Sequence, residues 1–434
     1  MADLDSSDDS MASATRSPGD AAHVESAPVE REGLRILVVS HSSPYPPTWG
    51  FAKRAFHLID GLASRHRVTV VSYVPPNLAP GELSALSERV HELVGVPRPK
   101  ENSTAKRVRQ FLSLLSRMPF HAAQLRDGAL QAAVDEVLAR EQFDVVQLES
   151  SQIGWLRFPP GLPVVVDEHN IESELLGRMG QTEASRVRRS YNRWEYRRYR
   201  AYEQRVWRSA EACATTSQRD ADTIAAQCPG LQVVVVPNGV DPDEFQPSAE
   251  PTQPGTIIFT GLLSYRPNQD GIRWFLNEVY PIVRQARPQA HLTVVGGGPD
   301  DLLESLRGPS VDVTGWVPDL RPLVDAAAVA VVPLRMGGGT RLKVVEAMSM
   351  SKAIVSTSLG AEGLHVVSGT HLELADDPVA FAARVVELLD DPARGARMGT
   401  EARRLVEEQY SWATAARRLE ELHLRLVART PEAG

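Results

Sequence analysis

The order of apolar and polar positions along the chain predicts two parallel β-sheets. Short β-branched runs alternate with longer stretches that carry apolar residues at helical spacing, such as Ala52–Arg65 and Leu130–Arg140. Runs that are apolar almost throughout are typical of strands buried on both faces in βαβ units. The first series of runs is Ile36–Ser40, Val68–Tyr73, Val145–Leu148, Val164–Asp167, Cys213–Ser217 and Val233–Val236.

The same pattern restarts after a proline-rich stretch, 237–255, which suits a semi-rigid linker. The second series is Ile257–Gly261, Leu292–Gly296, Val311–Thr314, Val329–Leu334, Ala353–Thr357 and Leu372–Ala375, and helical segments follow, ending with Trp412–Ala428. We therefore predict an α/β protein with two doubly wound, Rossmann-like domains that face each other across a cleft, where ligands bind. The predicted divisions are 1–32, 33–236, 237–405 and 406–434.

Composition and charge refine this organisation. The 434 residues are 42% hydrophobic and 24% charged, which excludes a single small module and a fibrous protein. Of the net charge of −8, −6 lies in residues 1–32, which have almost no large apolar residues and are predicted to be a disordered tail. No secretory signal or apolar membrane span is evident, so we expect a cytoplasmic protein in which Cys213 and Cys228 are core thiols.

The segment Val329–Met350 carries the most informative chemistry. A predicted strand runs into three glycines at 337–339, and Thr340 is the expected N-cap of the helix that follows. Backbone N–H groups at such a helix start favour an anion, and Arg341 and Lys343 add positive charge in its first turn. The segment therefore predicts a phosphate or diphosphate site, with Glu346 placed to accept hydrogen bonds from a sugar or ribose hydroxyl.

Five short motifs in order carry a resemblance to a known family. They are VPNGVD (236–241), LTVVGGGP (292–299), TGWVP (314–318), GGGTRLKVVEAM (337–348) and YSW (410–412). In this order they resemble the retaining GT-B glycosyltransferases of glycosyltransferase family 4, over residues 33 to about 425. The resemblance implies an N-terminal acceptor domain, a C-terminal nucleotide-sugar domain, a last helix that crosses back to the N-terminal domain, and transfer with retention and without a metal or cofactor.

The donor site that the resemblance implies departs from the family at two places. The family has two glutamates eight positions apart; here the second is Glu346, whereas Gly338 stands at the first. Backbone N–H groups of Gly338 and Gly339 are the expected substitutes, and the sugar stays open. The family's strand-end Arg and following Lys align with Leu262 and Pro267. Arg266 is then a candidate phosphate contact, or a surface residue.

The resemblance also implies roles for single residues. Glu346 and His169, which follows the run Val164–Asp167, are the predicted catalytic residues, with His169 orienting the sugar; a purely structural histidine is the alternative. Trp316 and Val317 are expected to flank the nucleobase. The predicted donor-binding residues are Arg266, Trp316, Val317, Gly338, Gly339, Thr340, Arg341, Leu342, Lys343 and Glu346.

The loop after the first predicted strand is the candidate acceptor site. Tyr45, Trp49 and Gly50 are its predicted acceptor-binding residues, and simple packing of the aromatic rings is an equal alternative. Asp241 and Asp243 form an Asp-x-Asp pair, but Pro242 favours local capping, so we predict no metal site.

Two basic stretches account for a charge of +5 over residues 33–230. Arg186–Arg208 interleaves nine arginines with aromatic residues, which favours a helix with its aromatic side chains packed inward over a nucleic-acid surface. Lys100–Phe120 is either an ordinary amphipathic helix or a segment that contacts an anionic membrane. We expect no nucleic-acid partner, and peripheral contact with the inner face of the membrane stays open.

The predicted activity is transfer of a hexose from a nucleoside diphosphate sugar to a hydroxyl of a glycan, a lipid-linked glycan or a secondary metabolite. Two alternatives remain. One is a sugar-nucleotide epimerase or hydrolase on the same fold, although the adjacent Asp167 and Glu168 would point apart on a strand. The other is a non-catalytic nucleotide-sugar-binding protein, which Gly338 makes plausible.

Overall fold

The computed structural model describes residues 33–75, 83–98, 118–181, 186–248, 250, 252–336 and 341–429. The tail 1–32, most of the basic segment Lys100–Phe120, and the loop residues 337–340 lie outside this range. The predicted donor-binding roles of Gly338, Gly339 and Thr340 therefore concern residues that the structure does not describe.

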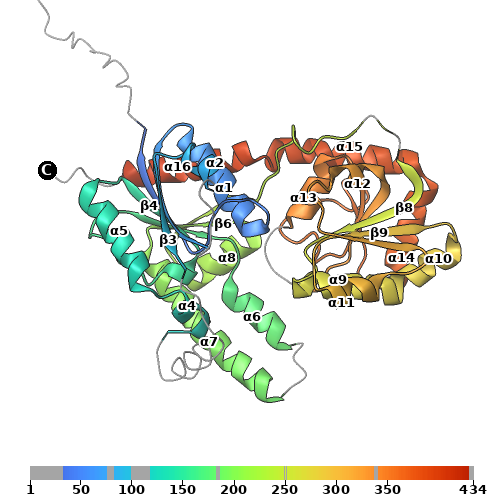
Figure 1. The fold of residues 1–434 in the computed structure, drawn as a ribbon, viewed down its shortest axis with the longest axis horizontal. Coiled ribbons are helices and arrows are strands. Elements are labelled where there is room, and N and C mark those ends of the chain that lie inside the picture. Colours follow the sequence, from blue (N-terminus) through green and yellow to red (C-terminus); the bar gives the residue numbers. More distant parts are fainter. Residues whose placement is uncertain are drawn as a thin grey trace, which may run out of the picture. The chain divides into compact units, whose positions relative to one another are not determined.

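Two all-parallel sheets organise the described residues, as the sequence pattern predicts (Figure 1). The first has the order β3-β2-β1-β4-β5-β6-β7. Its strands are β1 (Arg35–Ser40), β2 (Arg67–Val74), β3 (Glu92–Pro97), β4 (Val145–Glu149), β5 (Val164–Glu168), β6 (Ala212–Thr215) and β7 (Gln232–Val235). The predicted strands are confirmed to within a few residues. The edge strand β3 was missed, because Gly95 and Pro97 interrupt a run that is only partly buried.

The second sheet has the order β10-β9-β8-β11-β12-β13. Its strands are β8 (Gln253–Thr260), β9 (His291–Val295), β10 (Val311–Gly315), β11 (Ala327–Val332), β12 (Ala353–Ser356) and β13 (Glu373–Leu374). In both sheets the chain first builds outward on one side and then returns to the centre, so the strand order reverses between β1 and β4 and between β8 and β11. Crevices at the carboxyl ends of such reversal points are where parallel sheets bind ligands.

Helices separate the strands in each half, which is the doubly wound arrangement. In the first half they are α1 (Gly50–Ala63), α2 (Ser84–Ser87), α4 (Phe120–Gln124), α5 (Gly128–Arg140), a 3₁₀ turn (Ser151–Ile153), α6 (Glu172–Gln181), α7 (Arg186–Ser209) and α8 (Gln218–Gln227). In the second they are α9 (Arg266–Trp274), a π-helical turn (Phe275–Val279), α10 (Tyr280–Ala286), α11 (Asp300–Leu306), α12 (Arg321–Ala326), α13 (Leu342–Ser349), α14 (Pro378–Asp390) and α15 (Pro392–Gln409).

The last helix, α16 (Trp412–Val427), packs on the first sheet. Leu419 and Leu422 share a buried cluster with residues of β1 and β2. The approach to α1 is close, since a Cβ at Gly61 would lie 2.4 Å from Ala416 Cβ. Figure 1 shows α1 and α16 side by side. Helix α16 therefore packs in the core of the first half of the chain, although it follows the second half in sequence.

Some of the aromatic side chains of helix α7 lie in the protein core. Tyr199, Tyr202 and Trp207 are buried, and Tyr202 and Trp207 belong to the core cluster beneath one face of the first sheet. Three of the six aromatic side chains of this arginine-rich helix therefore pack inward, as predicted, and the other three are partly buried. Cys213 and Cys228 are buried free thiols, as expected.

Candidate active site

The first candidate site lies at the carboxyl ends of β1, β4 and β5, where the strand order reverses. Apolar residues fill the bodies of these strands, whereas polar side chains appear as each strand ends. His41 follows β1, Glu149 ends β4, and His169 follows β5. The parallel register places Glu149 opposite both Ser40 and Asp167, so these side chains meet at one edge of the sheet.

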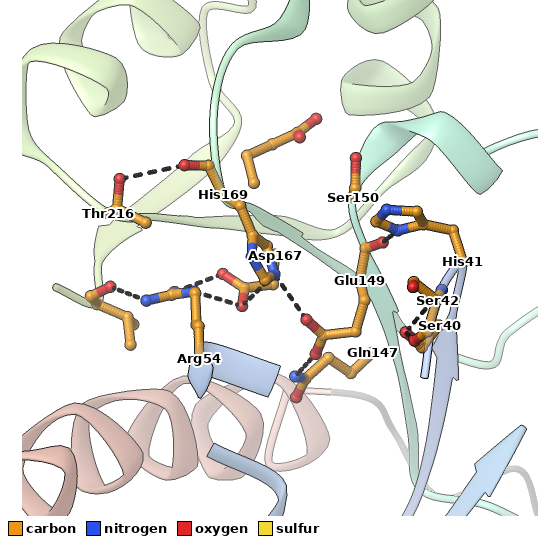
Figure 2. A network of polar contacts seen from close by, with 12 residues as sticks. Ser40, His41, Ser42, Arg54, Gln147, Glu149, Ser150, Asp167, His169 and Thr216 are labelled. Atoms are coloured by element: carbon orange, nitrogen blue, oxygen red, sulfur yellow. Dashed lines mark hydrogen bonds and ion pairs between the residues drawn. The ribbon is translucent and has the colours of Figure 1, made fainter. Parts of the chain in front are cut away.

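His169 is held by a buried carboxylate. Its Nε2 lies 2.7 Å from Oε2 of Glu149, whose side chain is fully buried, and 3.6 Å from Oδ2 of Asp167 (Figure 2). The Thr216 hydroxyl donates to the His169 carbonyl at 3.4 Å. The predicted catalytic histidine therefore occupies the carboxyl edge of the sheet with its ring position set by acidic neighbours.

Asp167 is neutralised by Arg54 from α1. The guanidinium donates through Nε to Oδ2 at 2.9 Å and through Nη2 to Oδ1 at 2.6 Å, and both side chains are buried. Nη1 of Arg54 also donates to the Val236 carbonyl and to Oδ1 of Asn238. A buried ion pair persists only when its hydrogen-bonding groups are satisfied in this way.

Adjacent positions of β5 point to opposite faces, as expected for a strand. Whereas Asp167 meets Arg54, Glu168 accepts a hydrogen bond from Nε1 of Trp207 at 2.7 Å on the other face. Burial raises the pKa of Glu168. Burial and, secondarily, the charge of Glu168 raise the pKa of Glu172 to about 7 and the pKa of Glu203 well above its usual range. The prediction that Asp167 and Glu168 point apart on the strand is confirmed.

Aromatic rings close one side of His169. Phe51 stacks on its imidazole with centroids 4.6 Å apart and an interplanar angle of 23°, and Trp49 stacks on Phe51 at 5.3 Å. Trp49 remains 45% exposed, whereas Tyr45 packs against Phe56. Tyr45 thus serves packing, whereas Trp49 keeps an exposed ring on the far side of a contact with Phe51; acceptor binding by this loop stays a prediction.

The second candidate site lies at the carboxyl end of β8, where the other strand order reverses. Lys343 Nζ lies 2.9 Å from Oδ1 of Asn268 and 4.6 Å from the ring centroid of Phe259. Burial, and secondarily the charge of Arg341, lower the pKa of Lys343 to about 7. A Cβ at Gly261 would lie only 2.5 Å from Nζ, so glycine is needed for this close approach.

Helix α13 begins one residue later than predicted. Its N-cap is Arg341, which makes no capping bond with its side chain, so the expected cap at Thr340 is wrong. Lys343 lies in the first turn, as predicted. The Leu342 side chain packs against the apolar cluster of the first sheet.

Glu346 is buried and bound by a lysine from the other half of the chain. Lys53 on α1 forms an ion pair with its Oε1 and lies over the ring of Phe245. A ribose at Glu346 would therefore share this carboxylate with Lys53 or displace it.

The rim of the second site is apolar. Trp316 is 68% exposed and Leu262 is 50% exposed, and both adjoin Gly297. Val317 is partly buried against the core. Arg266 is the first residue of α9 and is exposed. Trp316 therefore presents an exposed ring at this rim.

Potential metal ligands occur together once among the described residues, at Glu149, Asp167 and His169. Both oxygens of Asp167 accept from Arg54, and the Gln147 amide donates to Oε1 of Glu149 at 2.5 Å, whereas Oε2 of Glu149 faces His169. The Asp-x-Asp pair is local: Oδ1 of Asp241 accepts from the backbone N–H groups of Asp243 and Glu244.

Several residues of the two sites escaped sequence reasoning. Gln147 and Glu149 stand in a strand that is otherwise apolar, which is a signal that could have found them. Arg54, Lys53 and Asn268 lie on helices where polar residues are common, so nothing in the sequence marked them.

Comparison with known proteins places the chain in a family. The family "Glycosyl transferases group 1" matches residues 254–391, and the "Glycosyl transferase 4-like domain" matches residues 50–239. Together they cover about three quarters of the chain. The chain belongs to the group 1 glycosyltransferases. The family 4 resemblance drawn from the five motifs is thereby confirmed.

Two relatives are similar to this chain at low sequence identity. The chain is 28% identical over 163 residues to an uncharacterized 44.6 kDa protein in the cps region of Klebsiella pneumoniae, a match spanning 36% of this chain but only 42% of that protein. It is 25% identical over 410 residues to a glycogen synthase of Mycobacterium tuberculosis, covering 90% of this chain and 94% of the relative.

Solved structures show the same fold. Sucrose-phosphate synthase of Thermosynechococcus elongatus superposes with a TM-score of 0.67 at 18% identity, covering 91% of this chain and 99% of the other. Anabaena HepE, in complex with UDP-glucose, gives 0.63 at 15% identity, covering 90% and 100%. The glycosyltransferase has the GT-B fold, and no helix among its described residues has the length and apolarity needed to cross a membrane.

Proposed function

We propose that this glycosyltransferase moves a hexose from a nucleoside diphosphate sugar to a hydroxyl acceptor, with retention of configuration and without a metal ion. In the reaction the bond between the anomeric carbon and the diphosphate oxygen breaks, a bond to the acceptor oxygen forms, and the hydroxyl proton is released. The observation that carries the proposal is Lys343, a half-buried lysine whose amine lies beside Gly261 at the strand reversal of the second sheet.

The donor half of the proposal rests on complementary charge. Lys343, Arg341 and the backbone N–H groups of the 338–341 segment would hold the diphosphate and stabilise it as the leaving group, because fixed cations act strongly on developing charge in a site with little water. Glu346 would hold the ribose, and Trp316 would stack on the base. At the first candidate site, Arg54 supplies the positive charge that pairs with Asp167. That carboxylate therefore needs no metal ion to neutralise it, which supports transfer without a metal.

The acceptor half rests on His169, which would orient the reacting sugar or the acceptor hydroxyl beside Trp49 and Phe51. The acceptor is proposed to be a glycan, a lipid-linked glycan or a secondary metabolite. The positive charge of residues 33–230 supports an anionic acceptor or peripheral contact with an anionic membrane.

Calorimetry with nucleoside diphosphates tests the donor site first. We expect binding that is lost in Lys343→Ala and in Glu346→Ala, with Arg307→Ala, a substitution at an arginine paired with Glu304 on the surface, as the control. Protein that binds no nucleoside diphosphate would contradict the proposal.

Product analysis then separates the activities. A transferase yields a glycoside and free nucleoside diphosphate, an epimerase yields an isomeric nucleotide sugar, and a hydrolase yields free sugar. A non-catalytic protein binds the donor without any turnover. NMR of the anomeric proton decides retention, and an inverted product would refute that part of the proposal.

A further inference from the structure

Glu149 uses both carboxylate oxygens inside the protein. Oε2 contacts Nε2 of His169 at 2.7 Å, and Oε1 accepts from Nε2 of Gln147 at 2.5 Å. Gln147 and Glu149 are both fully buried, and β4 fixes their backbones between β1 and β5. The carboxylate is therefore anchored on one side by an amide and presents its other oxygen to the histidine.

This contact determines which ring nitrogen of His169 carries a proton. An ionised carboxylate only accepts hydrogen bonds, so Nε2 must donate in the contact with Glu149. The neutral ring then has its lone pair on Nδ1. A hydrogen-bonding partner of one ring nitrogen commonly selects the tautomer of a functional histidine in this way.

Nδ1 of His169 is open to a ligand. It has no hydrogen-bond partner within the part of the chain that the structure describes. It is also not one of the fully buried atoms without a partner in that part, so a ligand can reach it. The ring itself cannot swing freely, because Phe51 stacks on its face and Asp167 lies 3.6 Å from Nε2. The imidazole is thus fixed with one nitrogen engaged and the other accessible.

We propose that Glu149 is a positioning residue that holds His169 as the Nε2–H tautomer, so that Nδ1 accepts a hydrogen bond from a hydroxyl group of the bound substrates. The inference rests on the proposed glycosyl transfer and deepens it, since it assigns the atom of His169 that meets substrate. A hydroxyl of the donor sugar and the acceptor hydroxyl share this chemistry, and the kinetic measurements below distinguish them.

The first test is spectroscopic and needs no substrate. In protein with ¹⁵N-labelled histidine, long-range ¹H–¹⁵N spectra report the tautomer of each neutral ring, and His169→Gln identifies the His169 signals. We expect the Nε2–H pattern in the wild type and its loss in Glu149→Gln, whose amide can also donate. Glu195→Gln, at a buried carboxylate that contacts Phe120 N and Arg198 instead, is the matched control and should leave the pattern unchanged.

The second test is kinetic. Glu149→Gln should lower kcat/KM for transfer by at least about 10-fold, since partners that orient metal-binding histidines are worth about 10- to 100-fold and those of catalytic histidines more. If Nδ1 meets the donor sugar, slow donor hydrolysis and affinity for the nucleotide sugar fall too, while affinity for the free nucleoside diphosphate stays. If Nδ1 meets the acceptor, only transfer falls.

Two outcomes would overturn the inference: a Glu149→Gln protein with the wild-type His169 tautomer, or one with wild-type kcat/KM. Should Glu149→Gln fail to fold, Gln147→Leu serves instead, because it removes the anchor of Oε1 and should broaden or mix the His169 pattern; a sharp wild-type pattern there would also refute it. A wild-type protein that keeps the Nε2–H tautomer but binds no nucleotide sugar would contradict the proposed function alone.

Discussion

Lys343 on α13 and Asn268 on α9 meet at the carboxyl end of β8, with the ammonium 2.9 Å from the amide oxygen. Asn268 in turn donates to the Leu262 carbonyl at 2.8 Å, so the amide is fixed at both ends. The lysine is therefore held in place before any ligand arrives, and its charge state becomes the property that controls binding of a diphosphate.

The pKa of Lys343, lowered by burial to about 7, predicts that nucleoside diphosphate binding weakens with rising pH. The protonated amine binds the anion, and above pH 7 the free protein must first take up a proton, so affinity should fall by up to about tenfold per pH unit. Calorimetry between pH 7 and pH 9, where the diphosphate stays ionised, measures this. Lys343→Met should bind weakly with little pH dependence, and equal wild-type affinity at both pH values would contradict the prediction.

Gly261→Ala should disrupt the same site without touching a charged residue. The new Cβ would come within 2.5 Å of Lys343 Nζ and 2.8 Å of Asn268 Nδ2, at a φ of +154°. We expect a loss of nucleoside diphosphate affinity worth about 1–3 kcal/mol, the usual cost of such local strain. Gly369→Ala is the matched control, because Gly369 has a φ of +82° and nothing within 4 Å of its added Cβ. If both variants lost the same affinity, backbone strain alone would explain the effect, and the predicted clash with Lys343 would be wrong.

The buried pair Arg54–Asp167 predicts that losing one partner lowers the free energy of unfolding more than losing both. Arg54→Met leaves the Asp167 carboxylate buried without its partner, which typically costs about 3–5 kcal/mol. The double variant Arg54→Met/Asp167→Leu removes both charges and should regain much of that loss. Thermal unfolding of the two variants measures the difference, and a double variant less stable than Arg54→Met would disprove this account.

His423 on α16 predicts a distinct dependence of stability on acid. Its ring is fully buried, neither nitrogen has a hydrogen-bond partner in the described part of the chain, and burial lowers its pKa from 6.5 to about 3. Because the folded-state pKa is depressed, the stability it contributes is present above pH 6.5 and is lost as the pH falls toward 3.

His423→Leu should remove that acid sensitivity. It should also raise stability at pH 7 by about 1–3 kcal/mol, since an unsatisfied buried polar group is replaced by an apolar one. Thermal midpoints at pH 7 and pH 4.5 test both effects, with His91→Leu, at an exposed histidine, as the control. The prediction fails if the variant loses as much stability on acidification as the wild type.

The fold and the location of the chemistry could be read from the sequence. Continuous apolar runs such as those that became β1 and β11 predict buried parallel strands, because they are short and rich in β-branched residues and turn residues bound them. The polar residues that follow such runs, His169 among them, must then lie at a carboxyl edge, where parallel sheets bind ligands. The edge strand β3 escaped because partial burial weakens this pattern.

The contacts that give those residues their properties were decided only by tertiary structure. Glu149 lies 20 positions from His169, and Arg54 lies 113 positions from Asp167. Each pair meets because strand order and register bring distant segments to one edge, and its charges stay together because burial makes an unpaired charge costly. Periodicity reports which face of an element is apolar, but a side chain's partner across a sheet depends on where the neighbouring strand ends.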